Sequence, residues 1–130
     1  MFLIVQSVKP APSLSLFVDS FWMLHNASDD DKKVIVLPDG KIDLFFSLSA
    51  TEPFHVTLMG LGTQPDEATI TAHMVIFAIS FKLPATEYIL HQQVAHLTDN
   101  VALLPLDFWG FCVDDLNDFD SFCKKAAQKL

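Results

Sequence analysis

Short apolar runs, separated by clusters of turn-forming residues, constrain the fold of this chain more than any other feature. Within each run the apolar side chains recur at every second position, which is the period of a half-buried β-strand. The predicted strands cover residues 34–37, 42–48, 54–59, 68–73 and 74–82. The clusters between them are rich in Gly, Pro, Asn, Asp and Ser, which interrupt regular structure. Short strands joined by such turns favour an antiparallel sandwich or barrel.

The strand predicted at 74–82 differs from the others because both of its faces are apolar. Phe77 belongs to one face and Ala78 to the other. Two apolar faces are typical of a strand that is covered on both sides, so we expect this strand at the centre of a sheet. The strand at 42–48 instead carries Asp43 on one face. If this carboxylate is buried, it needs a lysine or a backbone N–H group as its partner.

Helical periodicity is present in three places. The segments are 12–18, 84–95 and 113–130, and the first two begin with a proline, which is favoured in the first turn of a helix. In the third, aspartates precede lysines, an order that suits the helix dipole. We therefore predict a mostly β domain at 1–112 with a helix near 84–95, followed by an amphipathic helix at 113–130.

Charge argues against nucleic-acid binding by this chain alone. There are 16 acidic residues and 8 basic ones, all of them lysine, and the net charge is −8. A nucleic-acid-binding surface needs clustered cations to neutralise phosphates, and arginine is the usual reader of guanine. The hydrophobic fraction of 51% is enough to build a core, so the chain is expected to fold.

We expect a cytoplasmic protein without a membrane segment. Residues 1–6 are mostly apolar but lack the basic start and the small-residue cleavage site of a secretory signal. The longest strongly apolar run, 74–81, is too short to cross a bilayer. Cys112 and Cys123 form no recognisable disulfide framework and are expected to be free thiols.

The motifs of the sequence point away from an enzyme and predict neither a cofactor nor a metal. There is no nucleophile elbow and no glycine-rich phosphate loop, and the five histidines show no metal-ligand spacing. Asp39 and Asp43 could form an acid–base pair. The stronger interpretation of Pro38, Asp39 and Gly40 is a structural turn, in which glycine supplies a positive φ and Asp39 bonds the backbone.

Small-molecule pockets are lined mainly by apolar and aromatic side chains with a few polar groups. The candidate ligand-binding residues are Trp22, Phe45, His73, Phe77 and Phe81. Two alternatives stay open: Trp22 is also a natural core anchor, and His73 would equally suit a hydrogen-bonded position at the edge of the core.

Three stretches of the sequence together resemble a known family. They are residues 34–46, which contain the sequence Leu-Pro-Asp-Gly, residues 58–82 and residues 97–110. In order and spacing they resemble the N-terminal sensor domain of one branch of the AraC-type transcriptional regulators. That branch has a Leu-Pro-Asp-Gly turn, a glycine- and threonine-containing turn like the one at 60–65, and a Leu-Thr-Asp segment. One departure is Ser80, which stands where the family has an arginine.

The resemblance implies a cupin-like antiparallel β-barrel or jelly roll with C-terminal helices, α+β overall. It further implies that the domain binds an unknown small-molecule effector and forms a homodimer. DNA would be bound only through a helix-turn-helix domain that this chain lacks, and the helix at 113–130 would either mediate dimerisation or lead to that domain. The candidate dimer-interface residues are Leu116, Phe119, Phe122 and Cys123. The alternatives are a stand-alone small-molecule-binding module and a small cupin-like enzyme.

Overall fold

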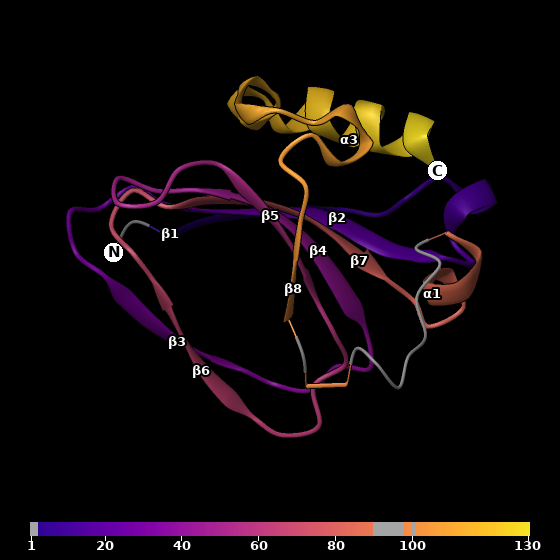
Figure 1. Ribbon diagram of the computed structural model, residues 1–130, viewed down its shortest axis with the longest axis horizontal. Helices are drawn as coiled ribbons and strands as arrows, with labels where there is room; N and C mark the ends of the chain where they lie inside the picture. Colours follow the sequence, from indigo (N-terminus) through magenta and orange to yellow (C-terminus); the bar gives the residue numbers. More distant parts are fainter. Residues whose placement is uncertain (1–2, 90–97, 100) are drawn as a thin grey trace.

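The computed structural model describes residues 3–89, 98–99 and 101–130 (Figure 1). Its largest element is a six-stranded sheet in the order β1-β2-β7-β4-β5-β8, and a two-stranded ribbon is formed by β3 and β6. The strands are β1 (Leu3–Val8), β2 (Val18–Asn26), β3 (Lys32–Val36), β4 (Ile42–Leu48), β5 (His55–Met59), β6 (Asp66–Ile70), β7 (Val75–Phe81) and β8 (Val101–Leu104). Every strand pair is antiparallel. The prediction of a mostly β, antiparallel fold with C-terminal helices is confirmed.

The central position predicted for the strand with two apolar faces is also confirmed. β7 lies between β2 and β4, and five of its seven residues are buried. Its neighbour β4 alternates in the way that the sequence predicts. In β4, Ile42, Leu44 and Phe46 are buried on one face, while Asp43 and Phe45 on the other are partly exposed.

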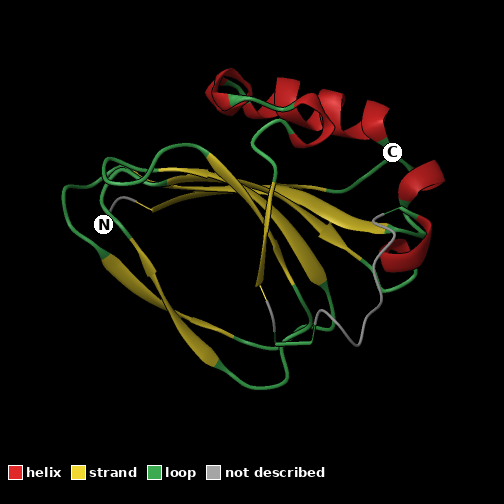
Figure 2. Ribbon diagram, viewed as in Figure 1, coloured by secondary structure: helices red, strands yellow, loops and turns green. Residues whose placement is uncertain are grey.

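One face of the main sheet is covered by the C-terminal helices (Figure 2). These are the short helices η2 (Phe108–Gly110) and η3 (Val113–Asn117) and the helix α3 (Phe119–Lys129). Phe122 is fully buried at the centre of this layer, and its ring centroid lies 5.5 Å from that of Phe46 and 5.2 Å from that of Phe77. The apolar stripe of the tail therefore completes the core of its own chain.

The β3–β6 ribbon lies on the other side of the main sheet (Figure 1). Asn26, the last residue of β2, is fully buried and connects the two sheets. Its amide nitrogen donates to the backbone carbonyls of Asp30, Ile70 and Thr71 at 2.9–3.1 Å. Among the described residues the two sheets share no strand pairing, so the expected barrel is seen as two separate sheets without closure.

Two short helices flank the sheet, η1 (Pro12–Leu14) and α1 (Ala85–Tyr88). α1 begins where a helix is predicted near 84–95, and residues 90–97 of that prediction lie outside the described part of the chain. In the part that the structure describes, no helix has the length and apolarity needed to traverse a bilayer.

Candidate functional site

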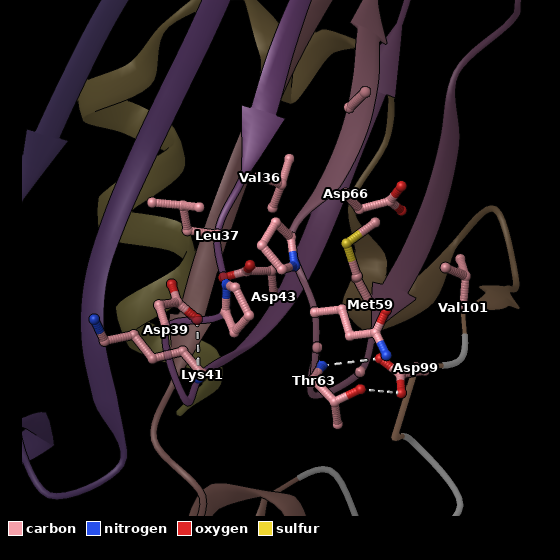
Figure 3. A pocket seen from close by; sticks show the side chains of 16 residues that line it. Val36, Leu37, Asp39, Lys41, Asp43, Met59, Thr63, Asp66, Asp99 and Val101 are labelled. Atoms are coloured by element: carbon pink, nitrogen blue, oxygen red, sulfur yellow. Dashed lines mark hydrogen bonds between the residues drawn. The ribbon is translucent and has the colours of Figure 1, made fainter.

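A pocket of about 480 Å³ lies where the ribbon joins the main sheet (Figure 3). Two connections meet there, the one from β3 to β4 and the one from β5 to β6. The lining residues are Val36, Leu37, Pro38, Asp39, Lys41, Asp43, Met59, Gly60, Gly62, Thr63, Gln64, Pro65, Asp66, Ala68, Asp99 and Val101. The size is typical of a site for a small organic molecule.

The Leu-Pro-Asp-Gly segment forms one wall of the pocket. Gly40 has a φ of 73°, in the left-handed region that glycine adopts without a steric penalty. Oδ1 of Asp39 accepts a hydrogen bond from the backbone N–H of Lys41 at 3.0 Å, which fixes the bend that leads into β4. This is the local geometry that the sequence predicts for Pro38, Asp39 and Gly40, and its consequence is that Asp39 and Lys41 both reach the pocket.

The opposite rim is held by a contact between two segments distant in sequence. The carboxylate of Asp99 accepts hydrogen bonds from the backbone N–H and the hydroxyl of Thr63, at 2.9 and 2.6 Å (Figure 3). The backbone N–H of Asp99 in turn donates to the carbonyl of Leu61 at 2.7 Å. The hydrogen bonds from Thr63 lower the pKa of Asp99, so this carboxylate is ionised at neutral pH.

The most distinctive group of the pocket is Asp43, on the face of β4 that is turned away from α3. Its Oδ1 accepts a hydrogen bond from the Ser80 hydroxyl at 2.5 Å, and the Ser80 oxygen accepts one from Nε1 of Trp22 at 2.8 Å. Its second oxygen accepts no hydrogen bond from any residue that the structure describes. Burial raises the pKa of Asp43 to about 6, although the Ser80 hydroxyl acts in the opposite direction.

The described lining is strongly acidic. It contains four carboxylates, Asp39, Asp43, Asp66 and Asp99, and one ammonium group, that of Lys41. Nζ of Lys41 lies 3.7 Å from Oδ2 of Asp19, a residue that does not line the pocket. The positive charge is therefore partly neutralised from outside, and the pocket carries a net negative charge at neutral pH.

Of the ligand-binding residues predicted from the sequence, two lie next to Asp43. Trp22 and Phe45 face each other across the small Ala78, with ring centroids 5.6 Å apart. They share the sheet face of Asp43, and Trp22 reaches Asp43 through Ser80. Neither belongs to the pocket lining itself.

The other three predicted residues, Phe77, Phe81 and His73, do not line this pocket. Phe77 and Phe81 project to the opposite face of β7. There the ring centroids of Phe77 and Phe119 are 5.4 Å apart, and Phe81 is fully buried. Side chains alternate between the two faces along β7, and Asp43 shares its face with Ser80, so Phe77 and Phe81 lie on the other face. His73 lies in the turn before β7 with a φ of 60°, and its Nε2 is 2.7 Å from Oδ1 of Asp29. It lies at an exposed connection and lines neither the pocket nor the core.

The four residues predicted to form a dimer interface face their own sheet. Leu116, Phe119 and Phe122 are 8%, 7% and 0% exposed. Within one chain Phe119 and Phe122 pack on Phe77 of β7, and Phe122 also packs on Phe46 of β4, so this apolar pattern contributes to the core of the domain. The dimer interface itself stays a prediction. Cys123 is partly buried, and burial raises the pKa of its thiol to about 11.

Sequence reasoning missed most of the pocket, above all Thr63, Asp66 and Asp99. The available signal is the set of three stretches that resemble the AraC-type sensors, because residues 37–39, 62–65 and 99, which belong to those stretches, all line this pocket. Their turn residues predict only local structure, whereas the prediction of ligand-binding residues rests mainly on aromatic side chains. In the described part of the chain, no three His, Cys, Asp or Glu side chains converge as metal ligands.

Comparison with known proteins gives one match. A family described as "Domain of unknown function (DUF6597)" matches residues 6–102, which include both strands of the ribbon and all the residues that line the pocket. No curated protein is significantly similar to the chain. No solved structure is significantly similar to it either. Because the family match spans most of the 130 residues, the chain belongs to this family, Domain of unknown function (DUF6597).

Proposed function

We propose that this chain is a cytoplasmic ligand-sensing domain of an AraC-type transcriptional regulator. Its task would be to hold a small-molecule effector in the pocket between the ribbon and the main sheet. The observation that carries the proposal is the convergence of residues 37–39, 62–65 and 99 on one pocket of about 480 Å³. These are the segments by which the sequence resembles the AraC-type sensors. DNA would be bound by a separate helix-turn-helix domain, since the net charge of −8 disfavours contact with phosphates.

The chain path offers a way for binding to be transmitted to the C-terminus. Asp99 holds the rim through Thr63 and directly precedes the segment that enters β8. β8 leads through η2 to α3, and Nζ of Lys125 in α3 donates to the carbonyl of Gly110 at 2.8 Å. A ligand that favours one arrangement of the rim would thereby favour one position of α3, which is the population shift expected of a sensor.

The first test is ligand binding by the purified chain. A metabolite collection is screened by thermal shift, because a ligand that binds only the folded state raises the melting temperature. Each hit is then mapped by amide chemical shifts. We expect hits to perturb the amides of residues 37–43 and 60–66.

A pair of adjacent substitutions localises the binding. Ala68→Phe places a large side chain in the pocket, whereas Thr69→Phe places the same side chain on the outward face of β6. We expect the first to abolish binding of the hits and the second to leave it unchanged. A collection without hits, or hits that survive Ala68→Phe, would contradict the proposal.

Transmission is tested on a chain in which the sensor is joined to a helix-turn-helix domain. A hit should change the affinity of that chain for its operator DNA, and the Ala68→Phe variant should not respond. A stand-alone binding module would give the same thermal shifts without any change in DNA affinity, so this experiment separates the two functions. The isolated chain should not retard DNA at moderate salt.

A further inference from the structure

We infer that the pocket selects an organic cation: a protonated amine on a compact apolar body, with the carboxylate of Asp43 as its charge partner. This inference rests on the proposed ligand-binding function and specifies the chemical class of the ligand. It is carried by the position of Asp43 in the wall of the pocket, by the groups around it, and by the apolar surface beside it.

The carboxylate of Asp43 is arranged to receive a donor from the pocket. Oδ1 is oriented by the Ser80 hydroxyl, which is itself held by the indole N–H of Trp22. Oδ2 has no hydrogen-bond donor among the described residues. A partly buried carboxylate with a fixed orientation and a free oxygen gains more from a cationic donor than an exposed carboxylate does, because less water competes.

The other charged groups of the lining also favour a positively charged ligand. Asp39 from the β3–β4 connection, Asp66 from the start of β6 and Asp99 from the rim all reach the lining. Lys41 is the one cation of the described lining, and it lies within 3.7 Å of Asp19. An anionic ligand would face several carboxylates, with one lysine that is already engaged. An anion is therefore disfavoured by the same field that attracts a cation.

The remaining lining limits the size and polarity of the ligand. Val36, Leu37, Pro38, Met59 and Val101 supply the apolar surface. Met59 is the cross-strand partner of Asp43, and Leu37 lines the same pocket (Figure 3), so a cationic head at Asp43 would have apolar surface beside it. A volume of about 480 Å³ suits a small amine and excludes a polymer.

The test uses three probes of the same size and different charge: benzylamine, benzyl alcohol and benzoate. Binding to the whole chain at pH 7.5 is followed by amide chemical shifts of residues 37–43 and 60–66. We expect benzylamine to bind about tenfold more tightly than benzyl alcohol, as for a charge-assisted hydrogen bond, and benzoate not to bind.

Asp43→Asn removes the charge and keeps the shape of the side chain. We expect it to reduce the affinity for benzylamine by about tenfold and to leave that for benzyl alcohol unchanged. Asp114→Asn is the matched control, since it makes the same change of net charge at an exposed position on η3. It should leave both affinities as they are.

A pH series gives an independent readout. The charged groups that act on Asp43 are Asp39, Lys41 and Asp19, and Asp66 and Asp99 share the lining. Benzylamine stays protonated below pH 8, so its affinity should fall as pH drops through about 6, where Asp43 takes up a proton. The Asp43→Asn variant should lack this fall.

Two outcomes would overturn the inference. In the first, benzyl alcohol or benzoate binds the pocket as tightly as benzylamine, or benzylamine keeps its affinity in Asp43→Asn. In the second, none of the three probes perturbs the pocket amides. Neither outcome decides the proposed ligand-binding function, which is judged separately by the unbiased metabolite screen and by the Ala68→Phe variant.

Discussion

Thr63 holds the carboxylate of Asp99 with both of its donors, the backbone N–H at 2.9 Å and the hydroxyl at 2.6 Å. The two residues are 36 positions apart in sequence. Their contact joins the β5–β6 connection to the segment that enters β8, so it closes the rim of the pocket on one side. The candidate site thus depends on a side-chain contact outside the sheets.

The first prediction concerns this contact. In Thr63→Val the hydroxyl is replaced by a methyl group of similar size, and the pKa of Asp99 should rise toward its ordinary value, because the hydroxyl is the main cause of its lowered pKa. A lowered pKa in the folded state stabilises the fold above the ordinary pKa of Asp, and this stabilisation is lost as pH falls through the folded-state value. The variant should therefore show a weaker loss of stability on acidification. Carboxyl-carbon NMR titration of Asp99 measures the change directly, and an unaltered titration midpoint would contradict it.

The second prediction concerns Asp43, whose pKa of about 6 has the opposite consequence for stability. The folded state retains a proton that the unfolded state releases between about pH 4 and 6, so stability falls as pH rises through this window. Asp43→Asn removes the cost of the buried charge and should be more stable than the parent at pH 7.5, by about 1–3 kcal/mol.

Urea unfolding of both proteins between pH 4 and 8 provides the measurement. Other carboxylates also titrate in this range, so the informative quantity is the difference between parent and variant. That difference should grow from pH 4 to pH 6 and then become constant. A difference that does not vary with pH would show that Asp43 is not the group responsible.

Three strands of the main sheet, β4, β5 and β7, could be predicted because burial imposes a pattern on their sequences. β4 is predicted with its observed bounds, Ile42–Leu48, because a covered face and an open face alternate along it. The central place of β7 follows from its two apolar faces. The edge strands β1 and β8 were not predicted. Their residues are mostly exposed or partly exposed, so their sequences carry little periodic signal.

The pocket could be predicted only in part, because its residues come from connections instead of periodic elements. The Pro38–Gly40 turn was identified from its own chemistry, but nothing local indicates that Asp99 meets Thr63. The aromatic character of Phe77 and Phe81 predicts pocket residues, but both are buried in the core, where Phe77 also borders a second pocket next to η3 and the start of α3. Aromatic side chains fill a core as readily as they line a cavity, and the helices of the tail decided which face of the sheet became the core.

The third prediction concerns Asn26, which holds the ribbon against the main sheet. Its amide donates to three backbone carbonyls, and its oxygen accepts hydrogen bonds from the backbone N–H and the hydroxyl of Ser28 at 3.1 and 2.7 Å. Asn26→Ala leaves buried backbone groups without these partners. We expect a loss of about 2–4 kcal/mol in the free energy of unfolding.

Hydrogen exchange locates the effect. In Asn26→Ala the amides of β3 and β6 should exchange faster, whereas those of β4 and β7 should change only with the global stability. Asn117→Ala, at an exposed position of η3, is the control and should stay close to the parent. Uniform acceleration across both sheets would show that the ribbon does not open on its own.

The fourth prediction tests whether the apolar face of α3 packs in the core of its own chain or forms a dimer interface. Phe119 and Phe122 are buried against Phe77 within one chain, so Phe119→Asp should destabilise or unfold the monomeric unit. Phe122→Ala should cost about 3–5 kcal/mol by leaving a cavity. Val113→Ala, at a 44% exposed position, should change stability by about 0.5 kcal/mol at most. Sedimentation and urea unfolding are measured together. A Phe119→Asp protein that keeps its stability but changes from dimer to monomer would show that this face binds a second chain, and that α3 does not rest on its own sheet in solution.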